Sequence, residues 1–384
     1  MSQSTAIPSL FARRAHTREA DPQRAVGALA EQLLARDASA VLLFCSGPYD
    51  LEQLGRAIEH DITVPVAACT CAGQIGAGGF ERGGISGVSL HSSDLEMRPL
   101  LLSPLSACQL QAVNLAREHA SRTAKRPGAR SFGLLMVDGL SLWEEYLAAA
   151  LYESLGNVPV VGGSAAAPYG RAEPAVYHGG RFLKSAAVLA LFETSSLTFA
   201  SFAAQHFIPS EKKLVITLAD PERRIVYEIN GQAAARSYAE ALGVTQAELG
   251  ERHFACHPLL LDLGEQQLPR AIRASGPDGS FAMACAIEEG LVVSLASSID
   301  PVTALRDALD EVSQRVPNPS ALLVFDSVQR RLELEARGLD LQVGTLLARR
   351  GAAGGSGYGE QLGPLHTSHT LTGIALGSTA PEAA

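Results

Sequence analysis

The chain has 384 residues, of which 47% are hydrophobic and 18% charged, and its formal net charge is −9. This length predicts two domains, or one large duplicated domain, with a sizeable core. The basic residues are scattered among acidic ones, which argues against nucleic acid as a partner. No apolar run is long enough to span a bilayer and the N-terminus lacks the apolar core of a secretory signal. We therefore expect a cytoplasmic protein with reduced cysteines and no membrane insertion.

Residues 1–20 are expected to form a weakly ordered lead-in, and Asp21-Pro22 predicts the start of the first helix. From there a strand–helix–strand pattern occurs three times, and each copy ends in a cluster of small residues. The first copy opens with the apolar run 41–44 and ends in the small-residue cluster 68–74. The corresponding segments are 134–137 and 162–167 in the second copy, and 322–325 and 354–360 in the third. This repetition predicts an α/β architecture with mixed sheets, built by internal duplication.

The small-residue clusters are predicted to form turns at equivalent places in the three copies. Residues without a bulky side chain allow backbone N–H groups to approach a ligand closely. The candidate ligand-binding positions in these clusters are Cys71, Gly73, Gly162, Gly163, Ser164 and Gly359.

In the middle of the chain the pattern changes to short strands and turns. The segment 214–229 has the pattern of a hairpin around Asp220-Pro221. We place the domain transition between residues 195 and 212. This division gives an N-terminal domain at 21–205 and a C-terminal domain at 206–384.

Several segments resemble signatures of the FIST family, whose members are bacterial sensory proteins with an N-terminal FIST domain and a C-terminal FIST-C domain. These segments include Ala68–Gly76, Val161–Ala166, Ala321–Ser327 and Tyr358-Gly359-Glu360. The chain departs from the family at Gln74, where Glu is commoner, and at Ser327, where Cys is frequent. The resemblance implies a FIST N-like domain at 21–205, a FIST C-like domain at 206–384, and a sensory rather than enzymatic role.

Within the family, the segments 43–51 and 205–210 are most similar to the nitric-oxide-sensing haem proteins known as NosP. That resemblance implies haem b as cofactor, nitric oxide as signal, and a histidine kinase or cyclic-di-GMP enzyme as partner, as in two-component regulation of biofilms. Since haem iron needs an axial ligand, it also implies His206 in that role, with Phe202, Phe207 and Pro209 around the haem. We leave a homodimer open.

Other interpretations stay open. His206 could be a structural or surface histidine at a domain junction. The chain could bind a small metabolite such as an amino acid, without haem, in a polar pocket where the small-residue turns converge. Catalysis is the least favoured alternative, because the chain has no nucleophile elbow, Walker A or zincin motif. Cys45 has no neighbouring histidine to form a thiolate, and Cys69 and Cys71 are too few for a zinc site.

The remaining polar candidates are assigned to the surface. His253 and His257 lie four residues apart, but the proline that follows them argues against a continuing helix, so we expect a loop. His366 and His369 lie close to the third small-residue turn and are expected to be exposed on a strand, with lining of a pocket as the alternative. The charged stretch 330–337 is expected to be a solvated helix face, with docking of a kinase as the alternative.

Overall fold

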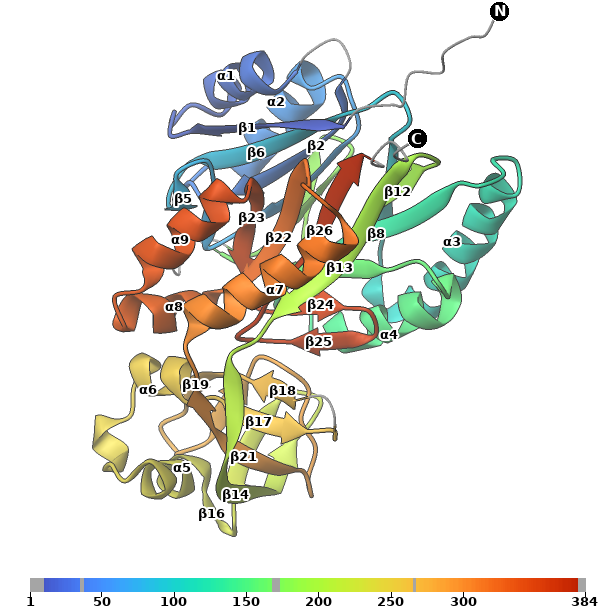
Figure 1. The fold of residues 1–384 in the computed structure, drawn as a ribbon. Coiled ribbons are helices and arrows are strands. Elements are labelled where there is room, and N and C mark those ends of the chain that lie inside the picture. The colour runs from blue at the N-terminus through green and yellow to red at the C-terminus, as the bar shows by residue number, and fades with distance from the viewer. Residues whose placement is uncertain (1–9, 35–37, 168–172, 265–266, 379–384) are drawn as a thin grey trace, which may run out of the picture.

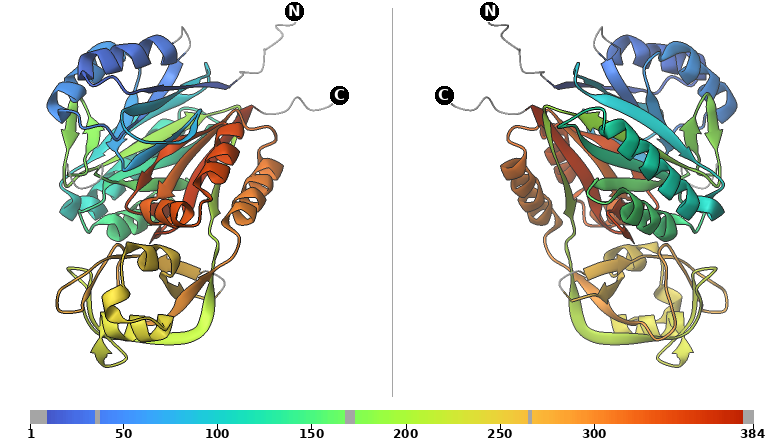
Figure 2. Two further views of the ribbon diagram at one scale, coloured as in Figure 1. Left: turned by 90° about the vertical axis from the view of Figure 1, so that its left-hand side faces the viewer. Right: turned by 90° about the vertical axis from the view of Figure 1, so that its right-hand side faces the viewer.

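The structure is a computed structural model that describes residues 10–34, 38–167, 173–264 and 267–378. It contains a larger body that holds all three repeats and a smaller body formed by residues 207–298 (Figure 1). Figure 2 shows the same division from two other sides, with the smaller body joined to the larger one by two neighbouring chain segments. Among the described residues, no helix is long and apolar enough to cross a membrane.

Each repeat supplies a strand, helical structure, a parallel strand, a short hairpin and a returning strand, in that order. The first repeat consists of β2 (Ala38–Cys45), α2 (Leu51–Asp61), β3 (Val66–Thr70), β4 (Gly73–Gly76), β5 (Gly79–Glu81) and β6 (Ile85–His91). The second consists of β8 (Arg130–Asp138), α4 (Glu144–Leu155), β9 (Val160–Ala165), β10 (Val176–His178), β11 (Arg181–Leu183) and β12 (Ala187–Thr194). The third consists of β22 (Ala321–Ser327), α8 (Val328–Ala336), α9 (Asp340–Arg349), β23 (Ala352–Gly357), β24 (Glu360–Leu362), β25 (Leu365–Thr367) and β26 (Leu371–Ser378).

Each repeat gives its hairpin to the sheet of another repeat. The sheet orders are β1-β6-β2-β3-β10-β11, β7-β12-β8-β9-β24-β25 and β13-β26-β22-β23-β4-β5. The edge strands of these sheets are β1 (Phe11–Thr17), β7 (Glu96–Leu102) and β13 (Leu197–Ala204). The exchange is cyclic, so each repeat completes one neighbour and is completed by the other. The predicted α/β class, with duplicated units and mixed sheets, is confirmed.

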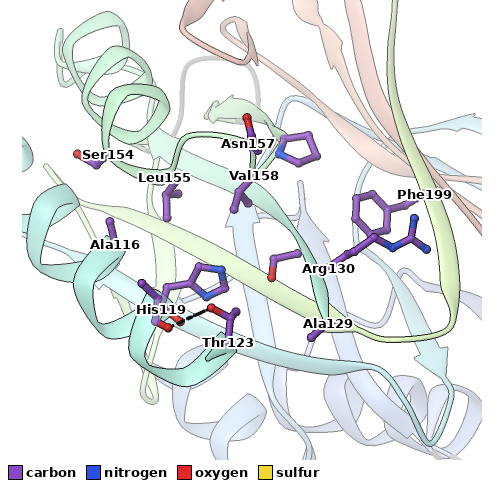
Figure 3. A pocket seen from close by; sticks show the side chains of 13 residues that line it. Ala116, His119, Thr123, Ala129, Arg130, Ser154, Leu155, Asn157, Val158 and Phe199 are labelled. Atoms are coloured by element: carbon purple, nitrogen blue, oxygen red, sulfur yellow. Dashed lines mark hydrogen bonds between the residues drawn. The ribbon is translucent and has the colours of Figure 1, made fainter. Parts of the chain in front are cut away.

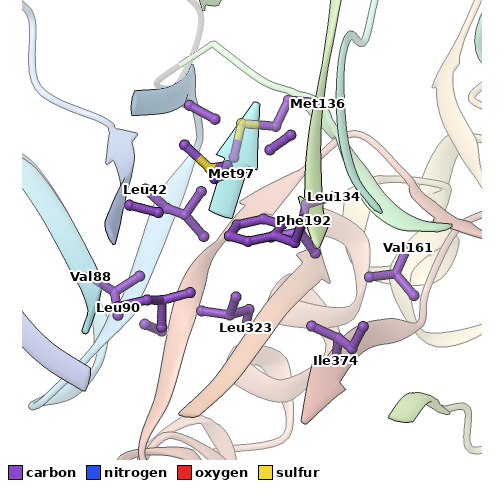
Figure 4. Packing of buried hydrophobic residues seen from close by; sticks show 14 of the residues in the cluster. Leu42, Val88, Leu90, Met97, Leu134, Met136, Val161, Phe192, Leu323 and Ile374 are labelled. Carbon is purple, nitrogen blue, oxygen red and sulfur yellow. The ribbon is translucent and has the colours of Figure 1, made fainter. Parts of the chain in front are cut away.

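The inner faces of the three sheets meet in one apolar core (Figure 4). Leu42, Leu134 and Leu323 come from the first strands of the three repeats, and each is fully buried or nearly so. Alternation along a strand sends the neighbouring side chains to the opposite face, where helices cover them. The helices that cover the outer faces are α1 (Pro22–Leu33) with α2, α3 (Cys108–Thr123) with α4, and α7 (Pro301–Arg315) with α8 and α9.

Local capping explains where several helices begin. Asp21 accepts a hydrogen bond from the backbone N–H of Arg24, and proline occupies the first helical position of α1. Asp50 caps α2 in the same way, and Asp300 caps α7. The predicted start of the first helix at Asp21-Pro22 is confirmed.

Residues 11–17, expected to belong to a weakly ordered lead-in, form the edge strand β1. This strand pairs antiparallel with β6 and occupies the place that β7 and β13 occupy in the other sheets. The guanidinium of Arg14 donates to the carbonyl oxygen of Ala352 at 3.1 Å. The sequence of β1 does not alternate between apolar and polar residues, because β1 is an edge strand and few of its side chains are buried. This is why the strand was not predicted.

The smaller body is inserted between β13 and α7 and has its own apolar core. Its elements are β14 (Phe207–Asp220), β15 (Ile225–Ile229), β16 (Gln232–Ala233), α5 (Ala234–Leu242), a short 3-10 helix (Gln246–Glu248), α6 (Glu251–Cys256), β17 (Leu259–Asp262), β18 (Gln267–Arg270), β19 (Ile272–Ser275), β20 (Phe281–Met283) and β21 (Val292–Ser298). β14 leads in and β21 leads out, and the two pair antiparallel from Phe207 opposite Ser298. Residues 299–378 then return to the larger body, so the third repeat packs with the first two.

Candidate functional site

The three small-residue clusters meet in a ring of backbone hydrogen bonds. One N–H of each cluster donates to a carbonyl oxygen of the next: Ala72 to Ser356 (2.9 Å), Ala166 to Thr70 (3.1 Å) and Tyr358 to Ser164 (3.0 Å). The donors and acceptors occupy equivalent positions in the three repeats. The clusters therefore converge as their repetition predicted, and the meeting point is tightly packed backbone.

Close packing explains the small residues of this ring. Gly162, Gly163 and Ser164 lie in strand β9 rather than in a turn. A Cβ at Gly162 would lie 2.2 Å from the carbonyl oxygen of Leu135, so no side chain fits there. Cys71 and Gly73 are buried where β3 leads into β4, and a Cβ at Gly359 would lie 2.4 Å from the ring of His366. These positions bring strands together, and the side chains around them carry the polar chemistry.

The third repeat places a buried arginine at the end of its parallel strands. Strand β22 ends in Asp326-Ser327, and α8 follows at once. The Arg330 side chain on α8 is fully buried, and its Nη1 donates to Oδ1 of Asp326 at 2.7 Å. Within the described part of the chain, its Nε and Nη2 have no hydrogen-bond partner, and neither does the hydroxyl of Ser327. Buried polar groups are nearly always paired, so this free guanidinium edge indicates a binding position.

Glu360, on β24, is a second buried ionisable residue with a side-chain atom that is unpaired within the described part of the chain. Its Oε2 accepts hydrogen bonds from the backbone N–H and the hydroxyl of Thr370, at 3.1 and 2.6 Å. Its Oε1 has no partner among the described residues. Burial raises the pKa of Glu360 well above its usual value; Thr370 opposes this effect and nearby Asp326 adds to it. Burial likewise raises the pKa of Asp326, although Arg330 opposes it.

The prediction that the charged stretch 330–337 is a solvated helix face is wrong for Arg330, Arg331 and Glu333. Arg330 and Glu333 are fully buried, and Arg331 is 5% exposed. Arg330 and Glu333 lie one turn apart on α8, where Arg330 pairs with Asp326 and Glu333 faces the connections to the inserted body. The side chain of Arg337, at the end of the helix, is 33% exposed. The helical spacing of these charged residues, together with Asp326 four residues before Arg330, was the sequence signal that could have predicted a buried ion pair here.

His206 and Glu333 form a buried pair at the junction of the two bodies. Nε2 of His206 lies 2.6 Å from Oε2 of Glu333, and the imidazole is 2% exposed. The other oxygen of Glu333 accepts from the hydroxyl of Ser298 at 2.9 Å and from Arg337 at 2.8 Å. His206 precedes β14 and Ser298 ends β21, so one carboxylate on α8 holds both connections to the inserted body. We refer to His206, Ser298, Glu333 and Arg337 as the hinge clamp.

The charges of the hinge clamp follow from its burial. Burial lowers the pKa of His206, and Glu333 offsets only part of this effect. Burial acts to raise the pKa of Glu333, but hydrogen bonds from His206, Arg337 and Ser298 outweigh it and lower the pKa. The pair is therefore a neutral imidazole that donates through Nε2–H to a charged carboxylate.

Comparison with protein families finds two domains of one family. The FIST N domain matches residues 39–232 and the FIST C domain matches residues 234–362. The chain belongs to the FIST family. FIST domains are sensory modules of signalling proteins, which confirms the predicted family and its sensory role. No curated protein matches this FIST chain. The border between the two domains lies at β16, inside the inserted body.

The described arrangement of this FIST chain does not fit a haem at His206. An axial ligand needs a ring nitrogen that points into a cavity, whereas Nε2 faces Glu333 and the ring packs on Phe207 at 4.4 Å between centroids. Five cavities formed by described residues are lined by other side chains. Phe202 lies on β13 and packs in a different apolar cluster from Phe207, and Pro209 lies in β14 opposite Ala296.

Two further histidine predictions differ from the structure. His366 and His369, expected to be exposed, are 3% and 0% exposed. Both follow the third cluster, and the inserted body packs over them. His253 lies in the short helix α6 rather than in a loop, and His257 ends that helix before Pro258.

The cysteines of the first repeat are inert by their surroundings. Cys45, Cys69 and Cys71 are buried and unbridged. Burial raises the pKa of all three, for Cys69 to about 12, so their thiols stay protonated at neutral pH. A nucleophilic role for them has no support here.

A groove of about 670 Å³ lies between α3 and the start of β8 (Figure 3). His119, Arg130 and Phe199 line it from three elements. Arg130 lies over the ring of Phe199 at 5.4 Å and donates to the carbonyl oxygen of Leu197 at 2.7 Å. Arg130 thus has a hydrogen-bond partner and a ring contact, whereas Arg330 pairs with Asp326 but keeps two nitrogens without a partner within the described residues.

Proposed function

We propose that this FIST chain is a sensory module that binds a small carboxylate ligand at the end of β22 and β23, with Arg330 as the anchor. The observation that carries the proposal is the fully buried guanidinium whose Nε and Nη2 lack partners within the described residues. These two nitrogens form one edge of the planar guanidinium, and two parallel N–H groups match the two oxygens of a carboxylate.

The position of Arg330 in the fold supports a ligand. β22 and β23 are parallel, and both run toward this end of the sheet. Ligands of α/β proteins bind at the carboxyl ends of parallel strands, where the helices and loops begin. The location of Arg330 at such a strand end therefore supports the proposed binding position.

An α-amino acid fits the remaining free groups. Oε1 of Glu360 and the hydroxyl of Ser327 are free acceptors within the described residues. With the ligand carboxylate on Arg330, its ammonium group can be received by these acceptors. A cation beside Glu360 would favour the ionised form of that carboxyl group, so binding should be accompanied by release of a proton.

The hinge clamp offers a route from ligand to signal. Arg330 and Glu333 lie one turn apart on α8, and Glu333 holds both connections to the inserted body. A ligand that moves Arg330 would move α8, and the two connections would follow. The inserted body would then present a different surface to a signalling partner, for which a histidine kinase or a cyclic-di-GMP enzyme is the proposal that the resemblance carries.

Calorimetric titration of the full chain with the common amino acids and with simple carboxylates tests the proposal. Arg330→Lys keeps the positive charge and loses the two-pronged edge, so we expect affinity to fall about tenfold or more. The matched control is Ser46→Ala. Ser46 is the residue of the first repeat that corresponds to Ser327 of the third, and this variant should bind the ligand as the wild type does. Unchanged affinity in folded Arg330→Lys would overturn the assignment.

Haem with nitric oxide is the second proposal, carried by the similarity of the segments 43–51 and 205–210 and by the location of His206 at the hinge. It requires the hydrogen bond between His206 and Glu333 to open. Absorption titration with haem, followed by reduction and nitric oxide, tests it. A saturable Soret band that is lost in His206→Ala would support haem binding. A non-saturating response would contradict it and favour the proposal of a carboxylate ligand.

A further inference from the structure

We propose a transition-metal site of the zinc class between the inserted body and the larger body, with Glu145, Cys285 and His366 as its ligands. One donor atom from each of the three side chains lies within 4.8 Å of the other two. Within the described parts of the chain, this is the one set of three such donors so close together.

Three separate parts of the fold bring these donors together. Glu145 lies in the first turn of α4 in the second repeat, and His366 lies on β25 of the third repeat. Cys285 follows β20 in the inserted body. The hairpin β24–β25 pairs with β9, which places His366 against the second repeat. An ion bound here would join two repeats and the inserted body.

The donor set matches the chemistry of zinc. A thiolate, an imidazole and a carboxylate are the three ligand types that Zn²⁺ takes in proteins, and three protein ligands leave the fourth position to water or a small solute. Donors around tetrahedral Zn²⁺ lie about 3.3–3.8 Å apart, given bonds of about 2.0–2.3 Å. Since the three atoms lie within 4.8 Å of one another, contractions of at most about 1–1.5 Å by side-chain rotation would close the site.

The surrounding hydrogen bonds hold two ligands in place. Nε2 of the Gln361 amide lies 3.0 Å from Nδ1 of His366, and Oε1 of the same amide has no partner within the described residues. Turning the amide over would let Oε1 accept Nδ1–H of His366, which leaves Nε2 of the ring as the metal donor. The same amide contacts the hydroxyl of Ser164 at 2.9 Å. A partner on the second ring nitrogen is typical of metal-binding histidines, because it fixes the orientation of the ring.

Glu145 is oriented from the inserted body. Its Oε1 accepts the backbone N–H of Ala286, the neighbour of Cys285, at 2.6 Å, and Arg224 binds its Oε2. Arg224 also pairs with Glu144 at 2.6 Å, which balances one of the two carboxylates. Each carboxylate oxygen has a second lone pair, so Glu145 can bind a metal ion through one oxygen and keep these contacts.

Burial gives the site both protection and an entry path. Cys285 is fully buried and His366 is 3% exposed, whereas the side chain of Glu145 is 21% exposed. An ion can therefore enter along the carboxylate and be held by the two buried donors. Its three ligands are other residues than Arg330 and the hinge clamp, and its test does not depend on the proposed ligand.

Metal content and a cobalt spectrum of the full chain test this inference. Protein loaded with Zn²⁺ and then dialysed should retain about one ion per chain. Loading with Co²⁺ instead should give the near-ultraviolet charge-transfer band of a thiolate ligand and the intense visible bands of a tetrahedral site. Cys285→Ser should lose the charge-transfer band, and His366→Gln should lose retained metal.

Two further variants separate metal binding from folding. Gln361→Leu removes no ligand but frees the His366 ring, so we expect affinity in a chelator competition to fall about 10- to 100-fold. Cys108→Ser removes another buried cysteine, on α3, and should leave metal content and spectrum unchanged. No retained metal in the wild type, or equal retention and spectrum in Cys285→Ser and His366→Gln, would overturn the site.

Discussion

The first and third repeats place different chemistry at the same backbone positions. Ser46 directly follows β2 and Ser327 ends β22, and their N–H groups donate to equivalent carbonyl oxygens, of Gly84 at 2.9 Å and Thr370 at 3.2 Å. By the same register, Gln74 of the first repeat corresponds to Glu360 of the third. The side-chain oxygens of Ser46 and Gln74 also lack partners within the described residues.

The difference lies in charge. The third repeat has Asp326 where the first has Cys45, and it adds the buried Arg330 from α8. Duplication thus supplied equivalent positions, and substitution made one of them ionic. The comparison teaches that the backbone of a repeat offers a strand-end position, whereas its side chains decide whether that position can bind a charged ligand.

Removing the buried cation should produce the largest effect. Arg330→Met leaves Asp326 buried without its ion-pair partner, so the free energy of unfolding should fall by about 3–5 kcal/mol. Ser46→Ala in the first repeat should change it by about 1 kcal/mol or less. Urea denaturation followed by circular dichroism measures both. Equal effects in the two repeats would show that the charge difference has no energetic consequence.

The core should respond equally in both repeats. Leu42→Ala and Leu323→Ala remove equivalent buried side chains from the central cluster (Figure 4). Each should cost about 2–5 kcal/mol, because a cavity remains where the side chain was. The same denaturation experiment gives the two values. A large excess at one site would show that the repeats differ in packing as well as in charge.

Glu360→Gln places the residue of the first repeat into the third. Burial raises the pKa of Glu360 in the folded protein. The contribution of its protonated form to stability is therefore fully present below the unfolded pKa of about 4.3, and it is lost as the pH rises toward the folded pKa. The variant should match the wild type near pH 4 and become more stable than it at higher pH, by about 1.4 kcal/mol per unit of pKa shift. Unfolding curves at several pH values measure the difference. A difference independent of pH would contradict the assignment.

Glu333→Gln should show the opposite pH dependence and the smallest effect. The pKa of Glu333 is lowered in the fold, so its contribution is present above the unfolded pKa and is lost as the pH falls through the folded pKa. We expect a loss of about 1–2 kcal/mol at pH 7 that disappears on acidification, since the hydrogen bonds from His206, Ser298 and Arg337 lose their charged acceptor. Limited proteolysis near residues 205–210 should also become faster. Glu335→Gln, a half-buried carboxylate on α8 that pairs with Arg331 instead of His206, is the control.

The repeats were predictable because their signals are local. Apolar runs and small-residue clusters recur at matching places, and each strand pattern lies within a few residues of chain. The hairpin exchange was not predictable, because β4, β10 and β24 are short and carry no mark of the sheet that they join.

The buried charges escaped prediction for a related reason. His206 and Glu333 are 127 residues apart in sequence, and each is an ordinary polar residue in its own segment. Cys285, His366 and Glu145 meet only once the inserted body packs against two repeats. Burial of such groups depends on partners that local patterns do not record, so a charged stretch such as 330–337 looks solvated until the fold is known.

The cyclic exchange of hairpins has a consequence for how the larger body comes apart. In an open array of repeats, the end units have one neighbour and fray first. Here every repeat has two neighbours, and detaching any one of them would strip strands from two sheets at once. The ring has no end unit, so the three repeats should unravel together as a single cooperative unit.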